Sequence, residues 1–181
     1  MPIYIAMLRG VNVSGQKIVR MERLRESCLR LGFQNVETYV QSGNIVFLAT
    51  KTSPSALSMG ISQEIFRDFG FSVPVFIRTP KEMGEVIKVN PFLKEKGIDP
   101  SRLYVTFLSE PASGSALKRL RELPAQTDRF QAVGREIYLY CPGGYGKTKL
   151  SNTALEKALS VGATTRNWKT VNTLFEMASK L

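Results

Sequence analysis

The chain has 181 residues, of which 43% are hydrophobic and 22% are charged, with both signs mixed along the sequence. This composition excludes an intrinsically disordered chain, and a chain of this length can bury a core without disulfides or metals. The formal net charge is +10 and there is no histidine, so every Ser-His, Cys-His and His-metal site is excluded.

The positive charge is concentrated in two windows. Residues 9–30 contain six basic and two acidic residues, and residues 147–169 contain five basic and one acidic residue, so the windows contribute +4 and +4 of the net +10. Such an excess favours anionic partners: nucleic acid, phosphorylated ligands or acidic proteins. The alternative is a basic surface that serves only solubility.

The first 80 residues predict the element order β-α-β-β-α-β. The predicted elements are a strand at 3–9, a helix at 21–31, a hairpin at 36–48, a helix at 54–69 and a strand at 73–78. Apolar runs of strand length and apolar residues at helical spacing define them, and Ser53 before Pro54 predicts the start of the second helix. This order is the split βαβ, or ferredoxin-like, pattern, in which two helices cover one face of a four-stranded sheet.

The second half repeats this order without repeating the sequence. Its predicted elements are a strand at 103–108, a helix near 117–123, a hairpin at 130–141 through Gly134-Arg135, a helix near 155–159, a short strand near Ala163 and a final helix from Trp168 capped by Thr164 or Thr165. Between the halves, a helix begins with a Thr79–Glu82 capping box and ends before Pro91.

These patterns predict an α+β protein of two tandem ferredoxin-like (βαββαβ) halves, each a mostly antiparallel sheet with helices on one face. Residues 1–80 form the first half, residues 81–101 a helix and linker, and residues 102–181 the second half with the C-terminal helix. A duplicated fold accounts for the repeated order.

Four separated stretches carry a resemblance to a known family. They are LRGVNVSG (8–15), YVQSGNIVF (39–47), GKTKL (146–150) and TTRNWKTV (164–171). In this order they resemble the domain-of-unknown-function 1697 family of small bacterial proteins. The resemblance implies a bacterial cytoplasmic protein with an α+β fold of ferredoxin-like halves, and it implies no activity and no catalytic residues. The residues that carry it are Arg9, Gly10, Asn12, Gln41, Ser42, Gly43, Asn44, Lys147, Lys149, Arg166, Asn167 and Trp168.

Two glycine-containing loops that precede helices are candidate anion sites. Loop 10–17 lacks the G-x-G-x-x-G spacing of dinucleotide-binding folds. Loop 141–148 approaches the G-x-x-x-x-G-K-[ST] phosphate loop but has Cys141 at the position of the first glycine. Backbone N–H groups of such loops can hold phosphate, and Lys147 can neutralise it. We expect anion binding without hydrolysis; the alternative is glycine-rich turns with solvated lysines.

The candidate ligand-binding residues combine these loops with their polar neighbours. Arg166 is expected to open the last helix, where an arginine and a positive helix end favour an anion, and Trp168 is assigned to the core. The full set is Arg9, Asn12, Lys17, Ser42, Asn44, Lys147, Lys149 and Arg166. No metal ligand or cofactor is expected, and no catalytic residue is identified, so the sequence leans against an enzyme without deciding the question.

Sheet-face RNA recognition is a further possibility for this fold. The first strand resembles half of that signature with Tyr4 facing outward, but the third-strand stacking positions fall on Ser42 and Asn44, which cannot stack bases. This mode is therefore not expected. Tyr4, Ala6 and Leu8 would share one exposed apolar face, and we expect the other half of the protein to cover it.

The favoured function is a binding protein for an anionic partner, either nucleic acid or a phosphate-bearing ligand. The alternatives are an enzyme acting on a small phosphorylated substrate, for which no acid or base is identified, and a protein-interaction module. No signal peptide and no apolar stretch of membrane-spanning length is present, so we expect a cytoplasmic protein without a membrane partner. Cys28 and Cys141 are expected to be buried, reduced thiols. The sequence gives no indication of the oligomeric state.

Overall fold

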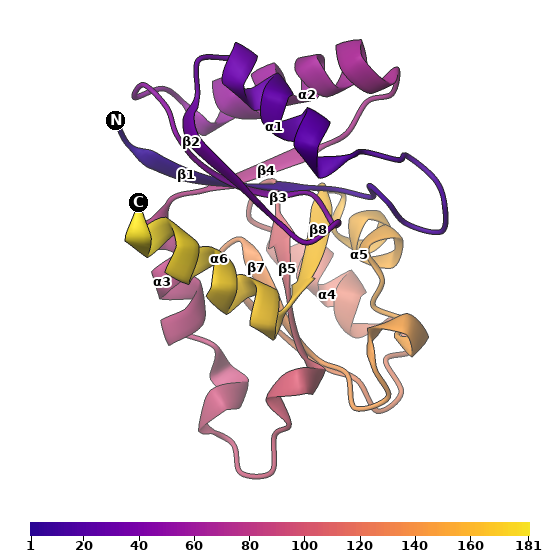
Figure 1. Cartoon of the computed structure of the whole chain (residues 1–181). Helices are drawn as coiled ribbons and strands as arrows, with labels where there is room; N and C mark the ends of the chain where they lie inside the picture. The colour runs from indigo at the N-terminus through magenta and orange to yellow at the C-terminus, as the bar shows by residue number, and fades with distance from the viewer. The chain divides into compact units, whose positions relative to one another are not determined.

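The computed structural model describes residues 1–181 and contains two four-stranded antiparallel sheets and six α-helices (Figure 1). This confirms the predicted α+β class. The chain divides into two compact units, residues 1–84 with 173–181, and residues 85–172. The division falls inside α3 (Pro80–Lys88) and inside α6 (Trp168–Lys180), so each of these helices contributes to both units. It therefore differs from the predicted boundaries, which assigned the whole C-terminal helix to the second half.

The first unit contains one sheet with the strand order β2-β3-β1-β4. Its elements are β1 (Ile3–Leu8), α1 (Met21–Arg30), β2 (Gln34–Tyr39), β3 (Asn44–Leu48), α2 (Pro54–Phe69) and β4 (Val75–Arg78). Helices α1 and α2 lie on one face of this sheet (Figure 1). As predicted, the Ser53 side chain accepts a hydrogen bond from the Ala56 N–H at the start of α2, and Gly70 ends the helix in the left-handed conformation.

Both faces of the central strand β1 are buried. Tyr4, Ala6 and Leu8 belong to the core beneath α1 and α2, while Ile5 and Met7, on the opposite face, are fully buried as well. The prediction that Tyr4 faces outward is wrong, because side chains alternate along a strand and the Tyr4 set faces the helices. Neither face of β1 is therefore open for stacking bases.

The second unit repeats the arrangement, with the strand order β6-β7-β5-β8. Its elements are three 3-10 turns, η1 (Pro91–Lys94), η2 (Pro100–Arg102) and η3 (Tyr145–Lys147), the strands β5 (Leu103–Leu108), β6 (Arg129–Val133), β7 (Glu136–Tyr140) and β8 (Ala163–Asn167), and the helices α4 (Gly114–Arg121) and α5 (Asn152–Leu159). The two-residue hairpin at Gly134-Arg135 forms as predicted, with Val133 opposite Glu136 and Gly134 at φ 59°. The two sheets also place a buried arginine at the same position: Arg78 opposite Ile5 on the first strand of one, and Arg166 opposite Val105 on the first strand of the other.

The last helix begins at Trp168, as its apolar spacing predicts, but its cap differs from the prediction. Thr164, Thr165 and Arg166 lie in β8, and Asn167 caps α6 by accepting a hydrogen bond from the Thr170 N–H (2.8 Å). The predicted threonine cap and the predicted place of Arg166 at the helix end are therefore wrong. Threonine is β-branched and favours the strand, while asparagine is among the strongest N-caps.

The two cysteines are free, buried thiols, as predicted. Burial raises the pKa of Cys28 to about 12 and that of Cys141 to about 11. Neither thiol is therefore ionised near neutral pH, which a nucleophilic role would require.

None of the helices combines the length and apolar character that crossing a lipid bilayer demands.

Candidate functional site

Asn12 organises the first glycine loop. Its side-chain amide donates to the carbonyl oxygens of Val19 (2.9 Å) and Gln41 (2.6 Å), and its Oδ1 accepts the Val19 N–H (2.9 Å). These bonds use both donors and the acceptor of the amide within the chain. Asn12 therefore has a structural role, which joins loop 10–19 to the β2–β3 turn.

The β2–β3 turn contains two further predicted site residues, Ser42 and Asn44. Asn44 is fully buried, and its amide donates to the carbonyl of Tyr39 (3.0 Å) and to Ser42 Oγ (2.9 Å). A residue without exposed surface cannot touch a ligand in solution, so Asn44 shapes the turn instead. Ser42 is half-buried and is part of the same turn.

Arg9 and Lys17 complete the predicted set in the first unit. Arg9 is half-buried just after β1, and its backbone N–H bonds to the Pro74 carbonyl (3.0 Å). Lys17 is exposed; its Nζ donates to the Ser72 carbonyl (3.1 Å) and lies 6.0 Å from the centre of the Phe71 ring. Lys17 therefore pins the loop to the segment before β4 while its charge stays in water.

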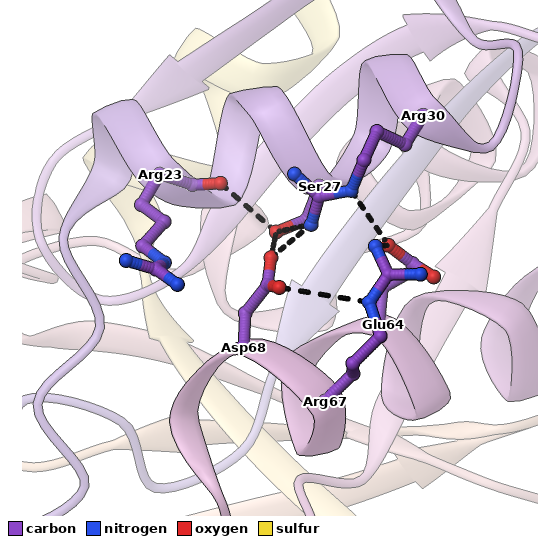
Figure 2. A network of polar contacts seen from close by, with 6 residues as sticks. All are labelled: Arg23, Ser27, Arg30, Glu64, Arg67 and Asp68. Carbon is purple, nitrogen blue, oxygen red and sulfur yellow. Dashed lines mark hydrogen bonds and ion pairs between the residues drawn. The ribbon is translucent and has the colours of Figure 1, made fainter.

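A polar network joins α1 to α2 (Figure 2). The Ser27 hydroxyl donates to Asp68 Oδ2 (2.5 Å), Arg30 donates to the same oxygen, and Arg30 Nε donates to Glu64 Oε2 (3.2 Å). Arg67 approaches both carboxylates. The Ser27 hydrogen bond, and then Arg30 and Arg67, hold the pKa of Asp68 below its usual range. Both carboxylates are paired with arginines, and Ser27 donates to one of them, so the network is a clamp between helices.

An open pocket beside this clamp has mixed charge. It is lined by Ile18, Arg20, Glu22, Arg23, Glu26, Asp68 and Phe69. The Arg23 guanidinium lies 5.8 Å from the centre of the Phe69 ring. Three acidic and two basic side chains around one pocket give no electrostatic preference for an anion.

The second glycine loop connects β7 to α5. Successive backbone bonds from Gly144 N–H to Cys141 (2.9 Å) and from Thr148 N–H to Tyr145 (3.1 Å) close it, and Lys147 and Lys149 are exposed. Helix α5 begins only at Asn152, and β7 is antiparallel to both of its neighbours. In a phosphate loop the helix starts at the lysine, after a strand of a parallel sheet. Nucleotide hydrolysis of that type therefore has no structural basis here.

A groove of about 400 Å³ lies in the second unit, where η2, the start of β5 and the start of α6 meet. We call it the Trp168 groove; its lining residues are Pro100, Ser101, Tyr104, Asn167, Trp168 and Lys169. Pairing of β5 with β8 sets Tyr104 opposite Asn167, which places the Tyr104 ring and the adjacent Trp168 indole at the same site. Both rings are half-buried, so each retains a surface toward solvent. The positive end of the α6 dipole lies at the same edge.

The glycine loop adjoins this groove. The Tyr145 ring packs on Tyr104 with centroids 5.2 Å apart, and the Cys141 N–H bonds to the Arg102 carbonyl (2.9 Å). A Cβ placed on Gly144 would stand 3.0 Å from Nη1 of Arg102, so the guanidinium lies directly against the loop. Four exposed cations lie on this loop and on the segments that line the groove, and we call them the basic rim: Arg102, Lys147, Lys149 and Lys169. The nearby acid Asp99 accepts hydrogen bonds from Ser101.

Arg166 lies beneath this region and not on its surface. Its Nη1 donates to Thr164 Oγ1 and to the Thr165 carbonyl, both at 2.9 Å. Burial lowers the pKa of Arg166 to about 10, and the nearby Tyr145 partly offsets this. Arg166 is thus a buried cation that is still charged at neutral pH.

The structure therefore brings Lys147, Lys149 and Arg166 into one region and places Arg9, Asn12, Lys17, Ser42 and Asn44 in the other unit. Sequence reasoning missed Arg102, Tyr104 and Lys169. The available signal was the pair of aromatic residues at the predicted start of β5 and α6: Tyr104 follows Arg102 by two residues, and Trp168 directly precedes Lys169. No three Cys, Asp or Glu side chains are grouped so that they could hold a metal ion.

A family model described as "Protein of unknown function (DUF1697)" matches residues 1–138. The chain belongs to this family. The identification made from four sequence stretches is thus confirmed, although the matched region contains only the first two of them, 8–15 and 39–47. The stretches 146–150 and 164–171 of this DUF1697 protein lie beyond residue 138.

Among solved structures, the chain is similar to the conserved bacterial protein SP0830 from Streptococcus pneumoniae. The TM-score is 0.74 at 20% sequence identity, and the match covers 98% of each chain. At this identity the likeness concerns the fold. No curated protein matches this chain.

Proposed function

We propose that this DUF1697 protein binds a phosphate-bearing anionic partner, nucleic acid or a nucleotide, through the basic rim of its second unit. The observation that carries the proposal is the set of four exposed cations on one glycine loop and on the groove that adjoins it. Lysine and arginine side chains on one surface attract phosphates and order them by charge.

The predicted contacts divide into two roles in this proposal. Lys147 and Lys149 contact the anion, joined by Arg102 and Lys169. Arg166, being buried, positions the loop from below. Arg9 and Lys17 stay as proposed anion contacts of the first unit by itself, since Lys17 keeps its charge in water.

The proposal also covers the topology of the two units and the cellular location of the protein. We propose that each unit is a ferredoxin-like half and that the two arose by duplication. The support is the shared strand order, in which the first strand lies between the third and the fourth, and the buried arginine at the same register position of both sheets. We also propose a bacterial cytoplasmic location, which the two free thiols support.

Charge reversal at the glycine loop tests the function. The variant Lys147→Glu/Lys149→Glu is compared with Lys118→Glu/Lys157→Glu, which makes the same charge change at two exposed lysines of α4 and α5. We expect the loop variant to lose binding to labelled single-stranded RNA and DNA near 0.15 M salt by roughly tenfold or more, while the control loses little. Equal loss in both variants would reduce the binding to a general effect of net charge and overturn the proposal.

A further inference from the structure

The Trp168 groove has the size and lining of a site for a flat aromatic ligand. Its volume, about 400 Å³, lies within the range of small-molecule sites, roughly 300–1,000 Å³. Tyr104 and Trp168 contribute the two largest side chains of its wall. Trp168 makes no ring contact with another aromatic residue of this chain, in contrast to Tyr104, which packs on Tyr145.

The groove and the basic rim together match the two parts of a nucleotide. A base has an apolar π-face that stacks on tyrosine or tryptophan, whichever base it is, and its phosphate requires a cation within a few ångströms. Lys169 is itself a lining residue of the groove, and Arg102 directly follows the lining residue Ser101. An aromatic wall and cations on adjacent residues thus occur at one site.

We propose that the Trp168 groove stacks an unpaired nucleobase on Trp168 and Tyr104 while the basic rim neutralises the attached phosphate. This inference rests on the proposed function and narrows it to a nucleotide unit, either free or within a single strand. Double-stranded nucleic acid does not fit, because its bases are stacked on one another and their faces are closed to protein rings.

Trp168 is the only tryptophan of the chain, so its fluorescence reports on the groove directly. The intact protein is titrated with a short single-stranded oligothymidylate, with adenosine monophosphate, and with inorganic tripolyphosphate, which carries charge without a base. We expect quenching or a spectral shift with the oligonucleotide or the mononucleotide and none with tripolyphosphate. The first two arms distinguish a strand from a free nucleotide, and either result supports the proposal.

Ring-deleting and ring-keeping variants give the second measurement. Trp168→Leu is paired with Trp168→Phe, and Tyr104→Leu with Tyr104→Phe, and binding of a labelled oligonucleotide is followed by anisotropy. Loss of one stacking ring is expected to weaken affinity roughly 5- to 150-fold, whereas the phenylalanine variants retain most of it. Thermal unfolding of each variant shows that it is folded before its affinity is interpreted.

The outcomes separate this inference from the function on which it rests. If the leucine variants bind like wild type, the fluorescence does not respond and Lys147→Glu/Lys149→Glu still weakens binding, the stacking proposal is wrong and anion binding through the loop stands. Tripolyphosphate that binds as tightly as the oligonucleotide leads to the same conclusion. If no base-containing ligand and no polyanion binds at all, both proposals fall.

Discussion

Gly43 occupies a place in the β2–β3 turn where backbone and space both exclude a side chain. Its φ is +75°, and a Cβ there would stand 2.7 Å from Cβ of Leu8 and 2.8 Å from Cγ2 of Val11. Leu8 and Val11 are buried and cannot move aside. We expect Gly43→Ala to lower the free energy of unfolding by about 2–4 kcal/mol, from the left-handed backbone and the overpacking together. Urea unfolding of the wild type and of Gly43→Ala measures this difference in the free energy of unfolding.

Gly70 provides the matched control, because it has nearly the same backbone angle, φ +80°, with open space around its Cα. Gly70→Ala should cost only about 1 kcal/mol, since it brings backbone strain without a clash. If both substitutions lower the free energy of unfolding equally, the β2–β3 turn can move to accept a Cβ. Contact with Leu8 and Val11 would then not restrict position 43.

At the residue scale, two polar signature residues have structural roles in loops. The side-chain amides of Asn12 and Asn44 donate hydrogen bonds to backbone carbonyls and to Ser42. These bonds fix the shape of loop 10–19 and of the β2–β3 turn. A sequence motif rich in Gly, Asn and Ser has the same composition whether it binds a ligand or builds a turn. The hydrogen bonds alone separate the two roles.

At the scale of elements, the clamp between α1 and α2 gives a prediction that depends on pH. Ser27→Ala removes a buried hydroxyl that donates to Asp68, and should lower the free energy of unfolding by about 1 kcal/mol near pH 7. The folded-state pKa of Asp68 is depressed, chiefly by Ser27. Its contribution is thus present above the unfolded-state pKa of about 3.9 and is lost as the pH falls through the lower folded-state value.

The difference between wild type and Ser27→Ala should therefore shrink as urea unfolding is repeated from about pH 7 down to about pH 3. Ser62→Ala is the control, because the Ser62 hydroxyl donates to the uncharged Val73 carbonyl (2.9 Å). Its cost should not depend on pH over this range. A Ser27→Ala cost that stays constant with pH would contradict a charged acceptor.

Elements with strong local signals could be predicted from the sequence. The Thr79–Glu82 capping box forms in both directions, with Thr79 N–H to Glu82 Oε2 at 2.7 Å and Glu82 N–H to Thr79 Oγ1 at 3.2 Å. The Gly134 hairpin and the Ser53 cap likewise depend on residues within a few positions of each other. Short-range hydrogen bonds leave their pattern in the sequence.

Features decided by distant pairing could not be predicted in the same way. The stretch 164–167 is compatible with a helix start or a strand, and pairing of Arg166 with Val105 on β5 decides for the strand. The side toward which Tyr4 faces was ambiguous because every residue from 3 to 8 is apolar, so the run lacks the alternation that marks one buried face. Of the site, the lysines of the glycine loop were foreseen, whereas Tyr104 and Arg102 enter only because β5, β8 and the loop meet.

At the scale of the whole molecule, the question is whether the two units unfold together. Each contains one buried cysteine, Cys28 in the first and Cys141 in the second. The raised pKa values, about 12 and about 11, keep both as protonated thiols in the folded state. Since only the thiolate reacts with alkylating reagents, each cysteine is expected to stay unreactive until its own unit unfolds.

We expect both thiols to become reactive at the same urea concentration. Helices α3 and α6 each cross the division between the units, so complete unfolding of one unit must break helices that also belong to the other. Short alkylation pulses near pH 8 across a urea series, followed by digestion and mass spectrometry, read both thiols in the same sample. Two separate midpoints would show that each unit is stable by itself and that unfolding the shared part of α3 and α6 does not destabilise the other unit. Coincident midpoints that match the loss of circular dichroism would establish that the two units unfold cooperatively.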